Sequence, residues 1–378
     1  MLLGVYITWL VHIQGRFQII VEPQPEQPGA TPIDSLPLIS VIIPARNEAR
    51  NIRRSVQALL RQTYPRYELI VVDDRSTDET PGILAGLVEE DTRLQVIPGN
   101  QLPEGWAGKP HALIQGAEDA RGEWLCFLDA DTFAHPDLLY AAYLQASEHR
   151  ADMFSILTRQ ELGTFWERVI LPLVFLGLSF GFPVERVNDP ARPEAISNGQ
   201  FILIRRSVYD HIGGHASVKN RIDEDKALAI VVKRAGFRLI MADGRKVAST
   251  RMYTSLPEMW EGWTKNIYLG LQDRLWLLLF GALLGLLVSI LLPVWLVGGG
   301  VWLASSGAPA AVIVVVDVLI LWGYLVWKRL RACQAFGIRA WYAFTFPLGA
   351  LIFTAMMFTS AYNGISGRGV SWKGRRYK

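Results

Sequence analysis

Trp124-Leu125-Cys126-Phe127-Leu128-Asp129-Ala130-Asp131 is the stretch that decides the fold. Its first five residues are apolar and follow Gly122, which is typical of a short buried strand. Asp129 and Asp131 then come one residue apart where the strand ends. In open α/β sheets the carboxyl ends of strands line the ligand crevice. Two carboxylates so placed suit Mg²⁺ or Mn²⁺ bound together with the phosphate groups of a ligand, although taken alone they also fit a polar strand end.

Strands and helices alternate on both sides of this stretch. Further short apolar runs predict strands over Leu38–Ile43, Glu68–Val72, Leu94–Ile97 and Ile196–Ile204. Apolar residues at helical spacing predict helices over Glu48–Gln62, Lys109–Ala120, Asp223–Gly236 and Ser255–Leu271. Ser76 or Thr77 is the expected N-cap of one more helix. The alternation predicts an α/β fold, with a largely parallel sheet that helices cover on both faces.

The composition indicates a membrane part beside the α/β domain. Of the 378 residues, 51% are hydrophobic, and the mean hydropathy of +0.21 is high for a soluble enzyme. The excess lies after Leu275, where three segments are each long enough to span a bilayer: Leu275–Leu303, Ala308–Trp327 and Trp341–Tyr362. The formal net charge of +3 is too small to indicate a nucleic-acid partner.

The chain is therefore expected to consist of five successive parts. These are a membrane anchor over 1–21, for which an interfacial helix is the alternative, a stiff proline-rich linker over 22–37, an α/β catalytic domain over 38–272, membrane helices over 273–363 and a basic tail over 364–378. Within the domain, the apolar segment 165–183 is interrupted by Pro172 and two glycines. We expect it to lie in the membrane interface rather than to span the membrane.

Basic residues and cysteines indicate the side of the membrane. Lys328–Arg331 flanks an apolar segment, as cytoplasmic loops do. A third span would place Lys373–Lys378 outside, so either the last segment is re-entrant or the tail departs from the positive-inside tendency. Cys126 in the core strand and Cys333 beside a membrane segment favour free thiols in a reducing compartment. We expect an integral protein of the plasma (inner) membrane with its α/β domain in the cytoplasm.

Polar residues follow the first two predicted strands, where ligands bind in α/β sheets. Pro44, Arg46 and Glu48 come after the first strand, and this loop can present backbone N–H groups and side chains to a nucleotide. Asp73 and Asp74 end the second strand, where a carboxylate can accept hydrogen bonds from a uracil N–H or a ribose hydroxyl. A solvated turn is the alternative interpretation.

Two further groups carry charge. Gly105-Trp106-Ala107-Gly108-Lys109 precedes a helix, so its glycines let the backbone approach a ligand and Lys109 suits an anionic phosphate. Asp223-Glu224-Asp225 forms a second acidic cluster, in which one carboxylate can serve as a general base. A surface lysine and an acidic helix start that complements the helix dipole are the corresponding alternatives.

Taken as a set, these motifs resemble the family 2 inverting glycosyltransferases with the GT-A fold. The set runs in order between Leu38 and Gly270 and comprises Pro44–Glu48, Asp73–Asp78, Gly105–Lys109, Asp129–Asp131, Asn198-Gly199 and Glu224-Asp225. Within that family the chain is most similar to the hopene-associated and carotenoid-type membrane enzymes. The similarity rests on Leu102–Lys109, Phe165–Arg168, Val187–Pro190 and the tail Ser371–Arg375.

The resemblance implies a GT-A (Rossmann-like) nucleotide-sugar-binding domain and a role for each motif. Asp73 or Asp74 would hold the uridine, and Asp129 and Asp131 would bind the metal–diphosphate, with Asp131 the more direct ligand. Asp225 would match the catalytic base, with Glu224 and Asp223 as alternatives. The remaining donor-binding residues would be Pro44, Arg46, Glu48, Lys109, Asn198, Gly199 and Lys265, of which Lys265 can neutralise a departing diphosphate.

The expected function is the transfer of a single sugar from a UDP-sugar to a hydroxyl of a membrane lipid, such as a hopanoid, carotenoid or sphingoid-like acceptor. The transfer would invert the anomeric configuration and depend on Mg²⁺ or Mn²⁺. A processive polysaccharide synthase is one alternative, but the Gln-x-x-Arg-Trp motif of processive members is absent, since the corresponding stretch is Glu261–Asn266. A non-catalytic, nucleotide-binding membrane scaffold is the other alternative.

Overall fold

The structure is a computed structural model that describes residues 19–23, 35–181, 183–271, 275–366, 370–372 and 375–377. The chain divides into two units, one formed by 1–161 with 179–252 and one by 162–178 with 253–378. Most of the predicted anchor and linker lies outside the described residues. Of the predicted anchor only 19–21 is described, and there the Val21 N–H donates to the Asp243 carbonyl at 2.8 Å.

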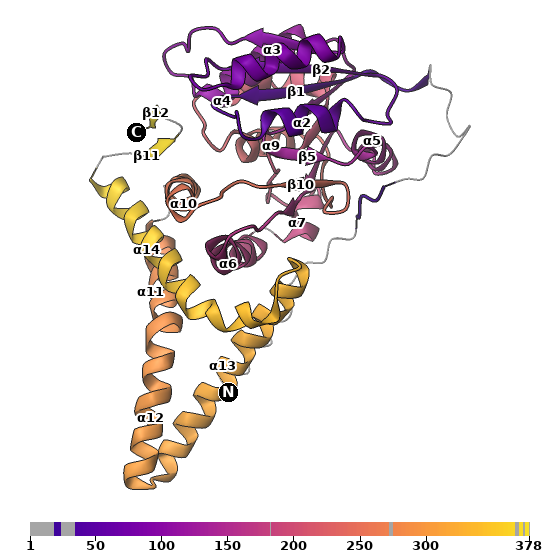
Figure 1. Ribbon diagram of the computed structural model, residues 1–378. Helices are drawn as coiled ribbons and strands as arrows, with labels where there is room; N and C mark the ends of the chain where they lie inside the picture. The colour runs from indigo at the N-terminus through magenta and orange to yellow at the C-terminus, as the bar shows by residue number, and fades with distance from the viewer. Residues whose placement is uncertain are drawn as a thin grey trace. The chain divides into compact units, whose positions relative to one another are not determined.

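A seven-stranded sheet forms the centre of the first unit (Figure 1). In spatial order its strands are β3 (Leu94–Pro98), β2 (Tyr67–Asp73), β1 (Ile39–Ala45), β4 (Trp124–Phe127), β8 (Ile202–Arg205), β6 (Met153–Leu157) and β9 (Leu239–Asp243). Strand β8 runs antiparallel to both of its neighbours, and the other pairs are parallel. The α/β fold with a largely parallel sheet is therefore confirmed.

Alternating side chains give the sheet two apolar faces. In β1, Val41 and Ile43 belong to one buried cluster and Ile42 to the other, because successive strand residues point to opposite faces. The first cluster includes residues of α2 (Ile52–Leu59), α3 (Thr80–Glu90) and α5 (Leu138–Glu148). The second includes residues of α4 (Gly108–Asp119) and α9 (Glu224–Arg234). Helices thus cover both faces, as the alternation predicts.

Several short elements did not show in the sequence. A three-stranded sheet joins β5 (Thr132–Ala134), β10 (Ala248–Thr250) and β7 (Arg159–Gln160). These strands have two or three residues each, which is too short for an alternation pattern. The strand predicted over Ile196–Ile204 forms only from Ile202 onward, as β8. The first unit also contains α7 (Val184–Asn188), α8 (Arg206–His211) and a 3₁₀ turn over Gly214–Val218.

The second unit consists of helices and a short hairpin. Its helices are α6 (Phe165–Gly181), α10 (Leu256–Leu271), α11 (Leu275–Leu286), α12 (Leu292–Ser306), α13 (Pro309–Ala335) and α14 (Phe346–Ile365), with a π turn over Leu287–Leu291 and a 3₁₀ turn over Ala340–Thr345. In the tail, β11 (Val370–Trp372) pairs with β12 (Arg375–Tyr377).

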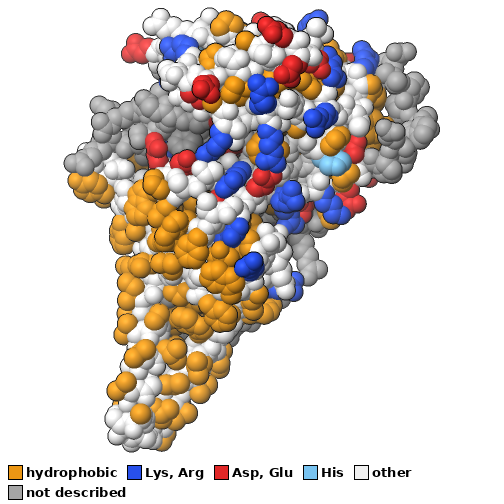
Figure 2. Space-filling view, in the orientation of Figure 1, with side chains coloured by type: hydrophobic (Ala, Val, Ile, Leu, Met, Phe, Trp, Pro, Cys, Tyr) orange, Lys and Arg blue, Asp and Glu red, His pale blue; other side chains and the backbone are white. Residues whose placement is uncertain are grey.

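Three of these segments are long and apolar enough to cross a membrane: Leu278–Ser306, Pro309–Ala335 and Ala340–Ile365. Large apolar side chains on them face outward, with Val297 68% and Ile313 63% exposed. Figure 2 shows hydrophobic side chains over most of the viewed surface of this part. Such a surface is unfavourable in water and favourable in lipid, so the segments fit the predicted membrane association.

A buried arginine donates hydrogen bonds to backbone carbonyls of α6 beside a proline. Pro172 lies inside α6 and has no N–H, so it cannot donate to the carbonyl of Arg168 four residues earlier. The Arg329 Nη2 of α13 donates instead to the carbonyls of Arg168 at 2.6 Å and Val169 at 2.9 Å. Arg329 is only 2% exposed. On α14, a β-carbon added to Gly349 would lie 2.8 Å from the same Val169 carbonyl, so these three helices meet at the proline.

This arrangement predicts an energetic coupling between Arg329 and Pro172. We expect Arg329→Met to cost about 1–2 kcal/mol more in the native sequence than in a Pro172→Ala background, because an alanine N–H can donate to the Arg168 carbonyl. Thermal or denaturant unfolding of the four proteins in detergent measures the difference. Arg331→Met, at an exposed position on the same helix, is the control and should show no coupling to residue 172. Equal costs in both backgrounds would contradict the assignment.

Candidate active site

The loops that carry the predicted residues meet at one edge of the large sheet. Strands β1, β2 and β4 are parallel, so their carboxyl ends lie at the same edge. Because β8 is antiparallel to β4, the turn that precedes β8 also lies there. This places Arg46 after β1, Asp74 after β2, Asp129 after β4 and Asn198-Gly199 before β8 at the edge where α/β sheets bind ligands.

An ion cluster forms at this edge. The Lys109 Nζ lies 2.6 Å from Asp129 Oδ1 and 2.6 Å from Glu224 Oε1. The Gly199 N–H donates to Asp225 Oδ2 at 2.9 Å. A β-carbon added to Gly199 would lie 2.9 Å from the Lys109 Nζ, 3.2 Å from Asp225 Oδ2 and 3.5 Å from an Asp129 oxygen. The structure thus brings together five predicted residues from four separate parts of the sequence.

Each member of the cluster is held by the start or end of a regular element. Asp129 follows the fully buried strand β4, and its carbonyl accepts from the Thr132 N–H at 3.0 Å. Lys109 is the second residue of α4. Glu224 and Asp225 begin α9, where the Lys226 N–H donates to Asp225 Oδ1 at 2.7 Å. Both oxygens of the Asp225 carboxylate are therefore oriented by backbone N–H groups.

Burial shifts the proton affinity of the cluster. Glu224 is 3% exposed, and loss of hydration raises its pKa to about 7, with the Lys109 charge opposing the shift. Burial also raises the pKa of Asp225, again against the effect of Lys109. For Lys109, burial lowers the pKa, but the carboxylates of Asp129, Glu224 and Asp225 outweigh it and hold the pKa well above its usual value. Lys109 therefore stays protonated.

The cluster carries fewer positive than negative charges. Three carboxylates face one ammonium group, and a fourth carboxylate, Asp131, lies two residues from Asp129. The Thr250 hydroxyl donates to the Asp131 carbonyl at 2.9 Å and contacts its Oδ1 at 3.3 Å. Among the described residues no group of three or more His, Cys, Asp or Glu is placed to hold a metal. Asp129 and Asp131 offer carboxylate oxygens, the ligand type that Mg²⁺ takes in small numbers together with a ligand's phosphates, and their role in metal binding stays a prediction.

The loops after β1 and β2 are joined by hydrogen bonds. The Arg46 Nη1 donates to the carbonyls of Asp74 at 2.7 Å and Arg75 at 3.0 Å. The Asn47 side chain accepts from the Thr77 N–H at 2.8 Å, while Asn47 itself has a φ of 53°, a left-handed conformation that asparagine tolerates. Arg46 therefore shapes the loop in which Asp74 lies, and its guanidinium contacts backbone carbonyls there.

The predicted helix cap in this region is wrong. Helix α3 begins at Thr80, and neither Ser76 nor Thr77 caps it. The Ser76 hydroxyl accepts from the Asn47 N–H at 3.0 Å, and the Ser76 N–H donates to Asp73 Oδ1 at 3.1 Å. Ser76 and Thr77 thus take part in hydrogen bonds that join the two loops. Such local side-chain bonds compete with helix capping.

The remaining predicted residues take positions around the cluster or away from it. The Asn198 Nδ2 donates to the Ile156 carbonyl at 3.0 Å and to Gln200 Oε1 at 3.1 Å, so it fixes the turn before β8. Pro44 is part of β1, and Glu48 accepts from the Asn51 side chain at 3.0 Å. Lys265 lies on α10 in the second unit, and its role stays a prediction.

Sequence reasoning missed two hydroxyl groups of the site. The Ser197 hydroxyl donates to the Asp225 carbonyl at 2.6 Å, and the Thr250 hydroxyl donates to Asp131. Neither residue belongs to a motif that the sequence reveals. The position of Ser197 directly before Asn198-Gly199 is the one available signal, whereas Thr250 lies in a strand too short to be predicted.

The comparisons with known proteins identify the family to which this domain is similar. Residues 40–213 match the family described as "Glycosyl transferase family 2". The 4,4'-diaponeurosporenoate glycosyltransferase of Staphylococcus aureus MRSA252 is 28% identical over 266 residues, which are 67% of this chain and 69% of the relative. The protein of the same description from strain NCTC 8325 is 28% identical over 265 residues, with the same shares.

Solved structures show the same fold. The mannosyltransferase PcManGT from Pyrobaculum calidifontis, solved in complex with GDP-Man and Mn²⁺, matches 97% of this chain and 96% of its own, with a TM-score of 0.54 and 17% sequence identity. Fold and sequence together define a GT-A glycosyltransferase domain, accompanied here by three long apolar helices near the C-terminus. Residues 40–213 therefore place this domain in glycosyltransferase family 2, and the chain is a distant homologue of the 4,4'-diaponeurosporenoate glycosyltransferases.

Gly199 offers a direct test of the ion cluster. We expect Gly199→Ala to lower glycosyl transfer at least about tenfold, because the new methyl group displaces the Lys109 ammonium and the Asp225 carboxylate from their positions. Stability should change little, since the lysine end is flexible. The measurements are turnover and the thermal midpoint. Gly86→Ala is the matched control, because a β-carbon at Gly86 on α3 meets nothing within 4 Å. Normal turnover of Gly199→Ala would contradict the placement.

Proposed function

We propose that this protein transfers a single sugar from a nucleoside diphosphate sugar to a membrane lipid, with inversion at the anomeric carbon and with Mg²⁺ or Mn²⁺. The observation that carries the proposal is the ion cluster of Lys109, Asp129, Glu224 and Asp225 at the carboxyl edge of the sheet. A UDP-sugar is the first candidate donor. GDP-mannose is the second candidate, because the fold neighbour PcManGT was solved in complex with GDP-Man.

In this mechanism Asp225 acts as the general base. Its carboxylate removes the proton of an acceptor hydroxyl while that oxygen attacks the anomeric carbon from the face opposite the diphosphate. The new carbon–oxygen bond forms as the bond to the diphosphate oxygen breaks, so an α-linked donor gives a β-linked product. The Gly199 N–H orients Asp225, and Lys109 holds Asp129 and Glu224 in place. A metal on Asp129 and Asp131 would offset charge on the leaving diphosphate.

Two features support a lipid acceptor. The chain has three segments long and apolar enough to span a membrane, and its relatives are named for a carotenoid acid, diaponeurosporenoate. A carotenoid acid has a carboxylate that can accept the sugar. A carboxylate is therefore a second class of acceptor group, in addition to the expected hydroxyl group. A carboxylate is already deprotonated at neutral pH, so transfer of the sugar to a carboxylate oxygen would need no general base.

The competing functions differ in their products. A processive polysaccharide synthase would give a ladder of products, whereas the proposed enzyme gives one sugar per lipid. A non-catalytic scaffold would give neither transfer nor hydrolysis of the donor. Membranes containing the protein are incubated with radiolabelled UDP-sugars and GDP-mannose, and the extracted lipids are then separated. A single labelled lipid that depends on the protein supports the proposal, and a ladder or the absence of any product overturns it.

We further propose that the glycosyltransferase domain faces the cytoplasm, where nucleotide sugars are made, and that 165–183 lies in the membrane interface. The basic stretch Lys328–Arg331 at the end of α13 supports this side under the positive-inside tendency. Labelling of single cysteines placed on the domain, in intact cells and in opened membranes, would test the orientation.

Asp131→Ala tests the metal assignment. We expect this change to weaken metal-dependent donor binding about tenfold or more, because it removes one of two oxygen ligands. Titration calorimetry with a UDP-sugar in the presence of Mn²⁺ and in EDTA separates the metal-dependent part of the affinity. Asp137→Ala, another aspartate of the same unit, is the control. Unchanged metal dependence would remove Asp131 from this role.

Asp225→Asn tests the base and the acceptor class together. We expect donor binding to persist while transfer to a hydroxyl acceptor falls by about 10²–10⁴-fold, which is the usual contribution of a general base. Transfer to a carboxylate acceptor should fall far less, since no proton has to be removed. Rates with a lipid alcohol and with a lipid carboxylic acid, measured on the native protein and the variant, provide the comparison. Normal turnover with the alcohol would exclude Asp225 as the base.

A further inference from the structure

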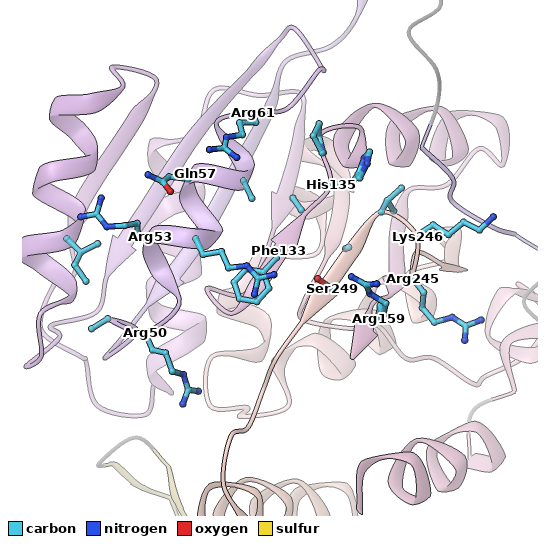
Figure 3. A pocket seen from close by; sticks show the side chains of 18 residues that line it. Arg50, Arg53, Gln57, Arg61, Phe133, His135, Arg159, Arg245, Lys246 and Ser249 are labelled. Carbon is cyan, nitrogen blue, oxygen red and sulfur yellow. The ribbon is translucent and has the colours of Figure 1, made fainter. Parts of the chain in front are cut away.

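A basic groove lies on the first unit, apart from the ion cluster. It has a volume of about 660 Å³ and runs between helix α2 and the small sheet of β5, β10 and β7. Figure 3 shows that its lining residues come from both sides, with Arg50, Arg53 and Arg61 on one side and Arg159 and Arg245 on the other. The groove shares no lining residue with the candidate active site.

The lining is cationic to an unusual degree. It includes seven basic side chains and neither Asp nor Glu: Arg50, Arg53, Arg54, Arg61, Arg159, Arg245 and Lys246. Figure 2 shows Lys and Arg side chains gathered on the viewed face of the molecule. Like charges at this density repel each other, so a groove without a counter-charge stores unfavourable electrostatic energy.

Neighbouring acids compensate only part of this charge. Four of the seven cations pair with a carboxylate just outside the groove, namely Arg53 with Glu90, Arg54 with Glu161, Arg245 with Asp243 and Lys246 with Glu22. Arg61 and Arg159 form no salt bridge or side-chain hydrogen bond with any described residue, although the charge of Arg159 acts on Glu161. Both are exposed; Arg61 lies in the turn after α2, and Arg159 begins β7. The uncompensated charge is therefore spread along the groove.

One arginine is fixed in the groove and gives it a rigid centre. The Arg54 guanidinium lies 3.5 Å above the Phe133 ring and makes two hydrogen bonds to Glu161, at 2.9 and 3.1 Å. Glu161 also accepts from the Ser249 hydroxyl at 2.8 Å. Arg54 connects helix α2 to the small sheet in this way, so the two sides of the groove are held at a defined separation.

We propose that this groove binds the phosphate groups of an anionic ligand, at a site separate from the donor site. Arginine guanidinium groups match phosphate oxygens in pairs of parallel hydrogen bonds, and several arginines on two sides of a groove suit two or more phosphate groups. The phosphates belong either to a soluble polyphosphorylated compound or to the headgroups of anionic lipids. The lining offers little to a nucleic-acid strand, because it has no Trp or Tyr and the ring of its one Phe, Phe133, is covered by Arg54.

The binding test uses the full chain in a neutral detergent with EDTA, so that metal-dependent binding at the donor site does not contribute to the signal. Pyrophosphate is the soluble probe, and dihexanoyl phosphatidylglycerol, with dihexanoyl phosphatidylcholine as its uncharged counterpart, is the lipid probe. Binding is followed by titration calorimetry and by the shift of the thermal midpoint. We expect the double variant Arg61→Gln/Arg159→Gln to weaken binding of the anionic probe about tenfold or more and to leave glycosyl transfer unchanged.

Arg234→Gln is the matched control, because Arg234 is an exposed arginine of the same unit that does not line the groove. Pyrophosphate binding that is lost in the double variant and kept in the control supports the soluble source. Phosphatidylglycerol binding that behaves in this way, without binding of phosphatidylcholine, supports the lipid source. If neither anionic probe binds, or if both variants bind them as the native protein does, the proposal is overturned. A residual signal from the donor site would persist in both variants and would therefore be recognised.

Discussion

The position of the Lys109 ammonium between carboxylates is the interaction on which the site depends. Asp129, Glu224 and Asp225 come from the end of β4 and the start of α9, and at an effective dielectric constant of 20 two carboxylates 4 Å apart repel by about 4 kcal/mol. Lys109 meets two of them at 2.6 Å, so the helices α4 and α9 can approach the edge of the sheet. One cation does not balance the cluster, so negative charge remains that a bound metal ion would offset.

Local patterns in the sequence predicted the fold and the candidate residues Lys109, Asp129 and Glu224-Asp225, whereas Gly199 was predicted only through the family resemblance. Buried runs such as Trp124–Phe127 identify strands without further information, and Asp129 follows one of them directly. The pairing of Lys109 with Glu224 had no such signal, since 115 positions separate them and only the sheet order brings α4 and α9 to one edge. The roles of Ser76 and Thr250 were hidden for the same reason, because a hydroxyl takes the partner that the tertiary structure places nearest.

Arginines occur in this protein in two opposite environments, and the environment determines what each can do. Arg329 is buried, and its Nη2 donates to two carbonyls that lie beside Pro172, so its structural partner is already present. Arg61 and Arg159 are exposed, and their guanidinium groups have no comparable partner among the described residues. An arginine of the first kind stabilises the chain's own backbone. One of the second kind is available to a ligand, and several together favour a ligand of opposite charge.

The chemical nature of the acceptor group determines whether the enzyme has to supply a general base. A lipid alcohol has to lose a proton as its oxygen attacks, and in the proposed mechanism the Asp225 carboxylate, which two backbone N–H groups orient, would accept that proton. A lipid carboxylate brings its negative charge to a cluster that is already acidic, so it would approach more easily once a cation has reduced that charge. In the proposed mechanism, the acidic cluster would therefore admit a neutral acceptor more readily than an anionic one, and a metal ion bound at the site would reduce this difference. This dependence follows from the charge of the site and applies whatever the lipid chain is.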